Sequence, residues 1–221
     1  MEHTVQIKHK KWLTHDVVQF TTEKPQNFTY TAGQAVEITL NDPKFKGDWA
    51  PFTMTGLNRD EYLEFTIKVY PDHNGMTLAL AKLKEGEGFV ITDPWDSFKY
   101  KGPGVFIAGG TGITPFIALL RQMEADGNIG GSTLLFSNKT EKDIFLFDEF
   151  KKMLGDNFIN VLTREEKKPY FHGRINKEFL KNHISGFDQP FYLCGPDNFA
   201  EEIKKHLVAL GAGEQMVNIS L

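Results

Sequence analysis

Two short segments combine glycine with hydroxyl, thiol and proline residues, and each of them follows an apolar run. The first is Gly109-Gly110-Thr111-Gly112-Ile113-Thr114-Pro115, and the second is Cys194-Gly195-Pro196. Glycines permit positive φ and a close approach of the backbone to a ligand, whereas Thr114 suits a helix cap and Pro115 a first helical position. Free amides at such a helix start attract phosphate. We therefore predict phosphate binding there. A plain strand-to-helix turn is the alternative, because Pro115 stands where a dinucleotide fingerprint has its third glycine.

Cys194 is the only cysteine of the chain. A single thiol forms no disulfide within the chain and no iron-sulfur or multi-thiolate zinc site by itself, and it fits a reducing compartment. We therefore expect a cytoplasmic protein. Taken alone, the residue is better interpreted as a small buried side chain than as a reactive thiol, but its place beside a second glycine segment favours a role in the site. The seven histidines show no spacing such as His-Glu-x-x-His, so no metal site is predicted.

The composition excludes several classes of protein. Asp and Glu number 29 against 25 Lys and Arg, for a net charge of -4, so we expect no binding to nucleic acid. No run of 18 apolar residues occurs and no leader is recognisable at the start, so we expect neither a membrane anchor nor a signal peptide. Nineteen phenylalanines argue for a packed core and against disorder. We expect a monomer.

The hydrophobic rhythm changes part-way along the 221 residues. From Thr4 to about Phe98 apolar residues recur at every second position, which is typical of antiparallel strands that close into a small barrel. After the turn at 102–104 apolar runs alternate with helical spacing, which is typical of a parallel sheet. The sequence thus predicts a β-barrel domain over residues 1–101 and an α/β domain with a five-stranded parallel sheet over residues 102–221.

The strands expected in the second half define where its two glycine segments lie. Expected strands are Val105 to Ala108, Thr133 to Phe136, Phe158 to Leu162, Pro190 to Leu193 and Met216 to Ile219. Expected helices lie near Phe116 to Met123, Phe145 to Leu154, Asn176 to Leu180 and Asp197 to Leu210. With the strand order 3-2-1-4-5, strands one and four are neighbours at the switch point, where doubly wound sheets bind ligands. Both segments then face one crevice.

In this order, and after a β-rich half, the two segments resemble the ferredoxin-NADP reductase family of flavoproteins, in particular its small bacterial flavodoxin or ferredoxin reductases. The resemblance implies a flavin-binding barrel followed by a pyridine-nucleotide domain. The family's Arg-x-Tyr-Ser/Thr signature is similar to Ala50-Pro51-Phe52-Thr53, so Phe52 is expected to stack on the flavin and Thr53 to hydrogen-bond near its reactive nitrogen. Ala50 departs from the family's arginine and removes a charge-assisted hydrogen bond of roughly 1.5 to 3 kcal/mol. We expect either weaker binding of flavin or substitution of the arginine by Lys68 or another cation.

The resemblance also assigns the next flavin segment. It is similar to Ile67-Lys68-Val69 followed by Gly75-Met76-Thr77, where the family uses backbone amides and a small hydroxyl residue against phosphate. Thr77 also suits a helix cap, and both roles are compatible.

The nucleotide is expected to be NADPH, with NADH as the alternative. An acid at the end of the second strand usually selects NAD, whereas here that edge reads Ser137-Asn138-Lys139. The third strand ends in Thr163-Arg164, which resembles the Ser-Arg pair that grips the 2′-phosphate in the family's NADPH users. Lys139 and Arg164 would supply positive charge, although each is also an ordinary surface cation.

The implied activity is hydride transfer from NADPH to bound FAD, with FMN less favoured, and then release of single electrons to a separate carrier such as ferredoxin or flavodoxin. Cys194 would lie beside the nicotinamide and Thr53 beside the flavin. Lysines clustered in the first half could steer an acidic carrier, or simply aid solubility; they are Lys8, Lys10, Lys11, Lys44, Lys46, Lys82, Lys84, Lys99 and Lys101. The chain ends in Leu221 and not in an aromatic lid, which predicts a less strict choice of nucleotide.

Two alternatives stay open at this point. One is a non-enzymatic or regulatory module that binds flavin or nucleotide, motivated by Ala50. The other is an electron-transfer subunit of a larger complex.

Overall fold

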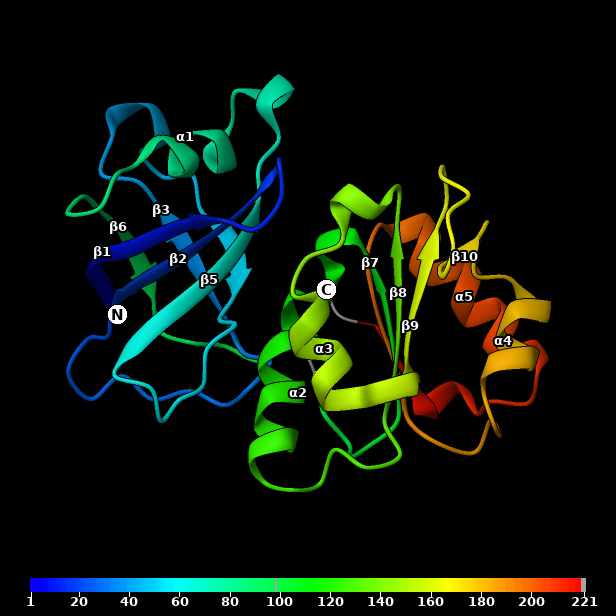
Figure 1. Ribbon diagram of the computed structural model, residues 1–221. Helices are drawn as coiled ribbons and strands as arrows, with labels where there is room; N and C mark the ends of the chain where they lie inside the picture. Colours follow the sequence, from blue (N-terminus) through cyan, green and yellow to red (C-terminus); the bar gives the residue numbers. More distant parts are fainter. Residues whose placement is uncertain (98, 220–221) are drawn as a thin grey trace. The chain divides into compact units, whose positions relative to one another are not determined.

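The computed structural model describes residues 1–97 and 99–219, which divide into two compact units (Figure 1). One unit is Met1–Ser97 together with Thr114–Gln122, and the other holds the remaining described residues. The expected end of the strand-rich half at Phe98 and the terminal Leu221 lie outside the described residues. The division at 101/102 stays a prediction.

The first unit is a six-stranded antiparallel sheet curled into a near-barrel. Its strands are β1 (Glu2–Trp12), β2 (Val17–Glu23), β3 (Ala35–Thr39), β4 (Ala50–Thr53), β5 (Tyr62–Lys68) and β6 (Gly88–Thr92), in the order β4-β3-β6-β1-β2-β5. The two edge strands approach each other just after β4, where Met54 bridges Phe65 and the Thr55 N–H donates to the Glu64 carbonyl at 2.8 Å. The expected barrel is therefore confirmed.

The alternating residues of these strands fill the inside of the near-barrel. Leu63, Phe65 and Ile67 on β5 are at most 2% exposed, and they share one face of the strand because successive side chains point to opposite faces. Phe89 of β6 lies between Phe20 and Phe65, with ring centroids 6.2 and 5.8 Å away in edge-to-face geometry. One helix belongs to this unit alone, α1 (Met76–Lys82).

The second unit contains a parallel sheet with the predicted strand order. Its strands are β7 (Val105–Gly109), β8 (Thr133–Asn138), β9 (Phe158–Leu162), β10 (Phe171–His172), β11 (Phe191–Cys194) and β12 (Val217–Ile219), in the order β10-β9-β8-β7-β11-β12. Without β10 this is the predicted order 3-2-1-4-5. The expectation of five strands was wrong by one, because β10 has only two residues and is too short to show a period.

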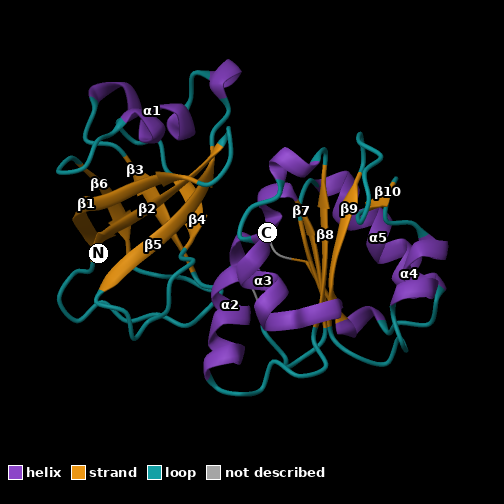
Figure 2. Cartoon of the chain, viewed as in Figure 1, coloured by secondary structure: helices purple, strands orange, loops and turns teal. Residues whose placement is uncertain are grey.

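Helices flank this sheet (Figure 2). They are α3 (Phe147–Leu154), α4 (Lys177–His183) and α5 (Asp197–Ala209), whereas α2 (Thr114–Ala125) has its residues up to Gln122 in the first unit. Side chains of α4 and α5 share a core with Val105, Ile107 and Leu135, whereas Phe150 of α3 lies on Phe158, with ring centroids 5.4 Å apart. Short 3-10 turns occupy Pro43–Phe45, Pro71–His73, Gly110–Ile113, Glu141–Asp143, Gly155–Asn157 and Glu214–Met216. Among the described residues, no helix has the length and apolarity that a membrane crossing requires.

Candidate functional site

The first glycine segment runs directly from strand into helix. β7 ends at Gly109, the 3-10 turn Gly110–Ile113 follows, and α2 begins at Thr114. The expected helix cap at Thr114 was wrong, since Thr114 is already the first residue of the helix, and the tighter 3-10 turn takes up the position before it. Pro115, expected at the first helical position, is the second residue of α2.

The structure brings the two glycine segments into contact. A Cβ at Gly112 would lie 2.2 Å from the Cys194 carbonyl oxygen and 2.6 Å from the Gly195 nitrogen, so only glycine fits there. Gly110 has φ +55°, a left-handed conformation that glycine adopts without strain, and the space around its Cα is open. Cys194 pairs with Ala108 across β11 and β7 and is partly exposed. A nucleotide backbone fits such a glycine-lined turn.

Phe199 is a neighbour of this turn that the sequence analysis missed. A Cβ on Gly109 would lie 3.2 Å from the Phe199 ring and 3.3 Å from Pro196, and one on Gly195 would lie 2.9 Å from the same ring. The Phe199 N–H donates to the Pro196 carbonyl at 2.8 Å, which opens α5. The signal in the sequence was an aromatic residue three positions after Pro196, in a helix that starts at a site.

The ends of β8 and β9 carry the residues expected at the 2′-position of the nucleotide. The Thr163 N–H and hydroxyl donate to the Asn138 carbonyl at 2.9 and 3.2 Å, and the Arg164 N–H donates to the Lys139 carbonyl at 2.9 Å. Lys139 and Arg164 are exposed, and within the described chain no carboxylate lies in ion-pair range of either. The backbones of the two cationic residues are thus joined by a hydrogen bond.

The segment Ala50–Thr53 forms β4, at one edge of the near-barrel. Phe52 is half-buried and packs on the barrel core, and Thr53 pairs with Ala35 of β3. Ala35 is bridged on its other side by Trp95, so the side chains of Thr53 and Trp95 share a face of the sheet. The Trp95 Nε1 is buried without a partner among the described residues. The sequence analysis missed this donor, because nothing in a lone Trp near a strand end marks it.

Ile67 and Val69 are buried, whereas Lys68 between them is paired. The Lys68 Nζ lies 2.5 Å from a carboxylate oxygen of Asp16, and the Val69 N–H donates to the Asp16 carbonyl at 2.7 Å. Burial works to raise the pKa of Asp16, but hydrogen bonds and the charge of Lys68, helped by Thr14 and His15, hold it below its usual value. Lys68 therefore already has a counter-charge, which weakens the expectation that it replaces the arginine missing at Ala50.

The turn at 74–77 differs from the expected cap. Gly75 is the residue before α1, and Thr77 lies inside the helix, where its hydroxyl accepts the Tyr70 N–H at 3.3 Å. The expected cap at Thr77 was wrong for this reason. Lys44 reaches the same turn, with its Nζ 3.0 Å from the Asn74 carbonyl, and is a cation that the sequence analysis did not single out for this position.

A buried ion pair lies beneath the barrel segments just described. The Arg121 Nη1 lies 2.6 Å from Glu64 and donates to the Thr55 carbonyl at 2.8 Å. The Thr55 hydroxyl donates to Glu64 at 2.7 Å and lies 3.2 Å from the Thr66 hydroxyl. The side chains of Arg121 and Glu64 are only 19% and 11% exposed. This network joins α2, the end of β4 and β5 within the first unit.

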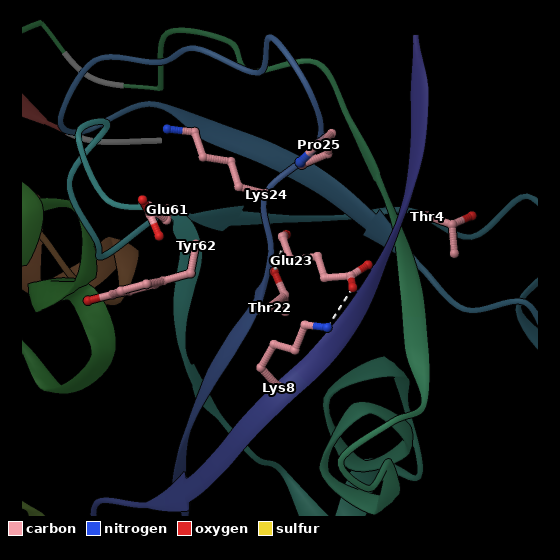
Figure 3. A pocket seen from close by; sticks show the side chains of 8 residues that line it. All are labelled: Thr4, Lys8, Thr22, Glu23, Lys24, Pro25, Glu61 and Tyr62. Atoms are coloured by element: carbon pink, nitrogen blue, oxygen red, sulfur yellow. Dashed lines mark hydrogen bonds and ion pairs between the residues drawn. The ribbon is translucent and has the colours of Figure 1, made fainter.

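A cavity of about 330 Å³ on the near-barrel contains none of the predicted site residues (Figure 3). Lys8 and Glu23 on its wall are paired at 2.6 Å, and Lys24 and Tyr62 extend away from this pair. Tyr62 is opposite Glu23 at one end of the β2–β5 ladder, and Lys68 is at the other end. The cavity is thus separate from the expected flavin segments.

Several of the clustered lysines already have partners within their own unit. The Lys10 Nζ donates to the Ala81 and Leu83 carbonyls at the end of α1, and the Lys101 Nζ donates to the Gln215 carbonyl at 2.8 Å. Burial lowers the pKa of Lys10, against the raising influence of Glu87. Some of the lysines expected to dock a carrier protein therefore stabilise the fold through these hydrogen bonds.

Comparison with known proteins gives each half of the chain a family. Residues 3–87 match the family described as an FAD-binding domain, and residues 106–205 match the family described as an oxidoreductase NAD-binding domain. The chain belongs to the ferredoxin reductase-like FAD/NAD(P)-binding oxidoreductases, which confirms the resemblance inferred from its motifs.

Individual relatives are distant. NADH-cytochrome b5 reductase 2 of Mycosarcoma maydis is 27% identical, over 89% of this chain and 62% of that protein. The reductase component of propane 2-monooxygenase from Rhodococcus jostii is 25% identical, over 93% of this chain and 59% of that protein. The chain thus spans about six-tenths of the length of these curated relatives. The solved structure of a ferredoxin NADP+ reductase from Neisseria gonorrhoeae has a TM-score of 0.84 at 19% identity, covering 99% and 98% of the two chains, and shows the fold alone.

Proposed function

We propose that this chain is an FAD-dependent NAD(P)H oxidoreductase that passes electrons to a separate carrier protein. The domains would be a flavin domain over residues 1–101 and a nucleotide domain over residues 102–221. The observation that carries the proposal is the contact of the two glycine segments at the switch point, where Gly112 leaves no room for a side chain beside Cys194. The family of each half supports it.

The roles of the nucleotide-side residues follow from this arrangement. The backbone of Gly109, Gly110, Thr111, Gly112, Ile113 and Thr114 would receive the pyrophosphate at the start of α2, and Cys194, Gly195 and Pro196 would border the nicotinamide. Positioning and exclusion of water are the protein's contribution. Arg164, supported by Thr163 and Lys139, would bind the 2′-phosphate, which favours NADPH over NADH.

The flavin-side residues would act in the same positioning manner. Phe52 would support the isoalloxazine ring. Thr53 and the Trp95 Nε1, which has no partner among the described residues, lie on one face of the sheet and would offer hydrogen bonds. The bound flavin supplies the conversion of a hydride into single electrons. Pro51, Ile67, Lys68, Val69, Gly75, Met76 and Thr77 would line the rest of the cofactor. FAD is favoured over FMN.

The electron acceptor would be a one-electron carrier such as ferredoxin or flavodoxin. A second candidate function is a reductase component of a larger assembly, which the similarity to the propane 2-monooxygenase reductase component favours. Copurification with a stoichiometric partner would favour the larger assembly, whereas a protein that purifies alone would favour the separate carrier.

A spectroscopic experiment tests the proposal. Purified protein supplied with FAD should become yellow, and anaerobic NADPH should bleach its visible flavin bands. In Gly112→Ala the bleaching should be at least about tenfold slower, because a Cβ 2.2 Å from the Cys194 carbonyl forces the two segments apart. Gly130→Ala is the matched control, since Gly130, like Gly112, has no positive φ, but a Cβ there would meet nothing within 4 Å. A protein that takes up no flavin would overturn the enzyme proposal in favour of a degenerate binding module.

A further inference from the structure

The loops that follow β8 and β9 are tied together by one acidic residue, Glu141. Its carboxylate forms an ion pair with the Lys167 Nζ and accepts a hydrogen bond from the Tyr170 hydroxyl at 3.2 Å. Its own N–H donates to a carboxylate oxygen of Glu165 at 2.8 Å. The hydrogen bond from Lys167, helped by that from Tyr170 and by the charge of Lys167, holds the pKa of Glu141 below its usual range against the effect of burial. Three contacts on one residue thus join the two loops beyond the ends of their strands.

The turn that carries Glu141 is itself fixed. The Thr140 N–H and hydroxyl both donate to Asp143 at 2.8 Å, which closes the 3-10 turn Glu141–Asp143. A closed turn gives the Glu141 carboxylate a defined direction. The loop 163–170 is therefore held at its start by the Arg164 N–H on Lys139 and near its end by Lys167 and Tyr170 on Glu141.

Of the acids of these loops, Glu141, Asp143 and Glu165 have partners, whereas, among the described residues, the two cations at the strand ends do not. Glu141 faces Lys167, Asp143 receives Thr140, and Glu165 receives the Glu141 amide. Within the part of the chain that the structure describes, no carboxylate pairs with Lys139 or Arg164. A carboxylate that moved onto Arg164 would neutralise it and compete with a bound phosphate monoester.

We propose that Glu141 is a positioning residue for nucleotide selection: by fixing the loop 163–170, it keeps Arg164 oriented and unpaired for the dianionic 2′-phosphate of the nucleotide. The inference deepens the proposed function and depends on it. Glu141 is an acid close to a phosphate site, so simple electrostatics makes it unfavourable for the ligand. Its contribution is favourable only if orientation of the loop outweighs that repulsion.

The sign of one substitution decides between these effects. Glu141→Gln removes a negative charge and the anchor of Lys167 and Tyr170. We expect the Kd of 2′,5′-ADP to rise about fivefold, the upper range for an exposed pair, while the Kd of 5′-ADP, which lacks the 2′-phosphate, stays unchanged. Glu166→Gln is the matched control, because Glu166 is exposed and neighbours Arg164 and Lys167 in sequence; its Kd for 2′,5′-ADP should stay equal or fall.

Isothermal titration calorimetry of the flavin-loaded protein measures the Kd of both ligands, and hydrogen exchange measures how often the backbone of loop 163–170 opens. Faster exchange over 163–170 in Glu141→Gln, with an unchanged melting temperature, supports the positioning role. Tighter or unchanged binding of 2′,5′-ADP by Glu141→Gln would overturn it, and so would an equal weakening of both ligands, which a merely structural role would give. Wild-type protein that binds both ligands equally would instead overturn the NADPH part of the proposed function.

Discussion

The two units each contain a carboxylate paired with a cation, but the pairs differ sharply in burial. The side chains of Glu64 and Arg121 are 11% and 19% exposed, whereas those of Glu141 and Lys167 are 38% and 46% exposed. Breaking a buried pair leaves a charge without water or partner, whereas an exposed charge is simply rehydrated. The same chemistry therefore supports the fold in the first unit and only the orientation of a loop in the second.

Arg121→Met should have the largest effect on stability. It leaves the carboxylate of Glu64, on β5, almost buried and without its cation, which costs about 3 kcal/mol of unfolding free energy, the lower end of the range for a broken buried pair. Urea unfolding followed by tryptophan fluorescence measures the loss. The contact of Arg121 with the Thr55 carbonyl adds to it, because that carbonyl also loses its donor.

The double variant Glu64→Leu/Arg121→Met is the control for this prediction. Removing both charges relieves the unpaired carboxylate, so the double variant should be clearly more stable than Arg121→Met alone. The Thr55 hydroxyl keeps Thr66 as a partner at 3.2 Å. A double variant as unstable as the single one would show that packing of the Arg121 stem, and not the charge, is what matters.

Asp16→Asn should have an intermediate effect that depends on pH. The side chains of Asp16 and Lys68 are 18% and 21% exposed, and the pKa of Asp16 is lowered in the folded protein. A lowered carboxyl pKa stabilises the fold above the ordinary value of 3.8, and this contribution disappears as the pH falls through the folded pKa. The unfolding free energy of wild type should exceed that of Asp16→Asn by about 1 kcal/mol near pH 7, and the difference should disappear as the pH falls through the folded pKa of Asp16.

Unfolding curves recorded near pH 7 and at successively lower pH test the direction of this change, with Asp48→Asn as the exposed control. A difference that grew on acidification would mean that Asp16 is protonated in the folded protein, contrary to the ion pair at 2.5 Å.

The period of the sequence was enough to predict most of the architecture. Phe158–Leu162 forms β9 over the predicted residues, and the order of β7, β8, β9, β11 and β12 is as predicted. The glycine segments were placed in contact by that order alone, because neighbouring parallel strands bring their ends to one edge. Strands and helices with a clear hydrophobic period, and the loops whose position follows from the strand order, could therefore be predicted from the sequence.

Contacts between distant side chains were not accessible in this way. Arg121 and Glu64 are 57 positions apart, and neither residue type nor spacing identifies the partner. The same holds for Lys68, whose pairing with Asp16 changes its expected role, and for the Trp95 nitrogen. Thr114 and Thr77 were misplaced by one or two residues, since a 3-10 turn and a glycine took the positions expected for their caps.

Glu141→Gln should have the smallest effect on stability, although it is the same kind of change as Glu64→Gln. Lys167 loses a partner but is 46% exposed, so water replaces the carboxylate at little cost. The melting temperature of Glu141→Gln should stay within about 1 °C of wild type, whereas that of Glu64→Gln should fall by several degrees, because the largely buried Arg121 then faces a neutral amide in place of the Glu64 carboxylate. Calorimetry of both variants measures the contrast. Equal melting temperatures for the two variants would mean that the barrel network tolerates a neutral partner, and that burial does not distinguish the two pairs.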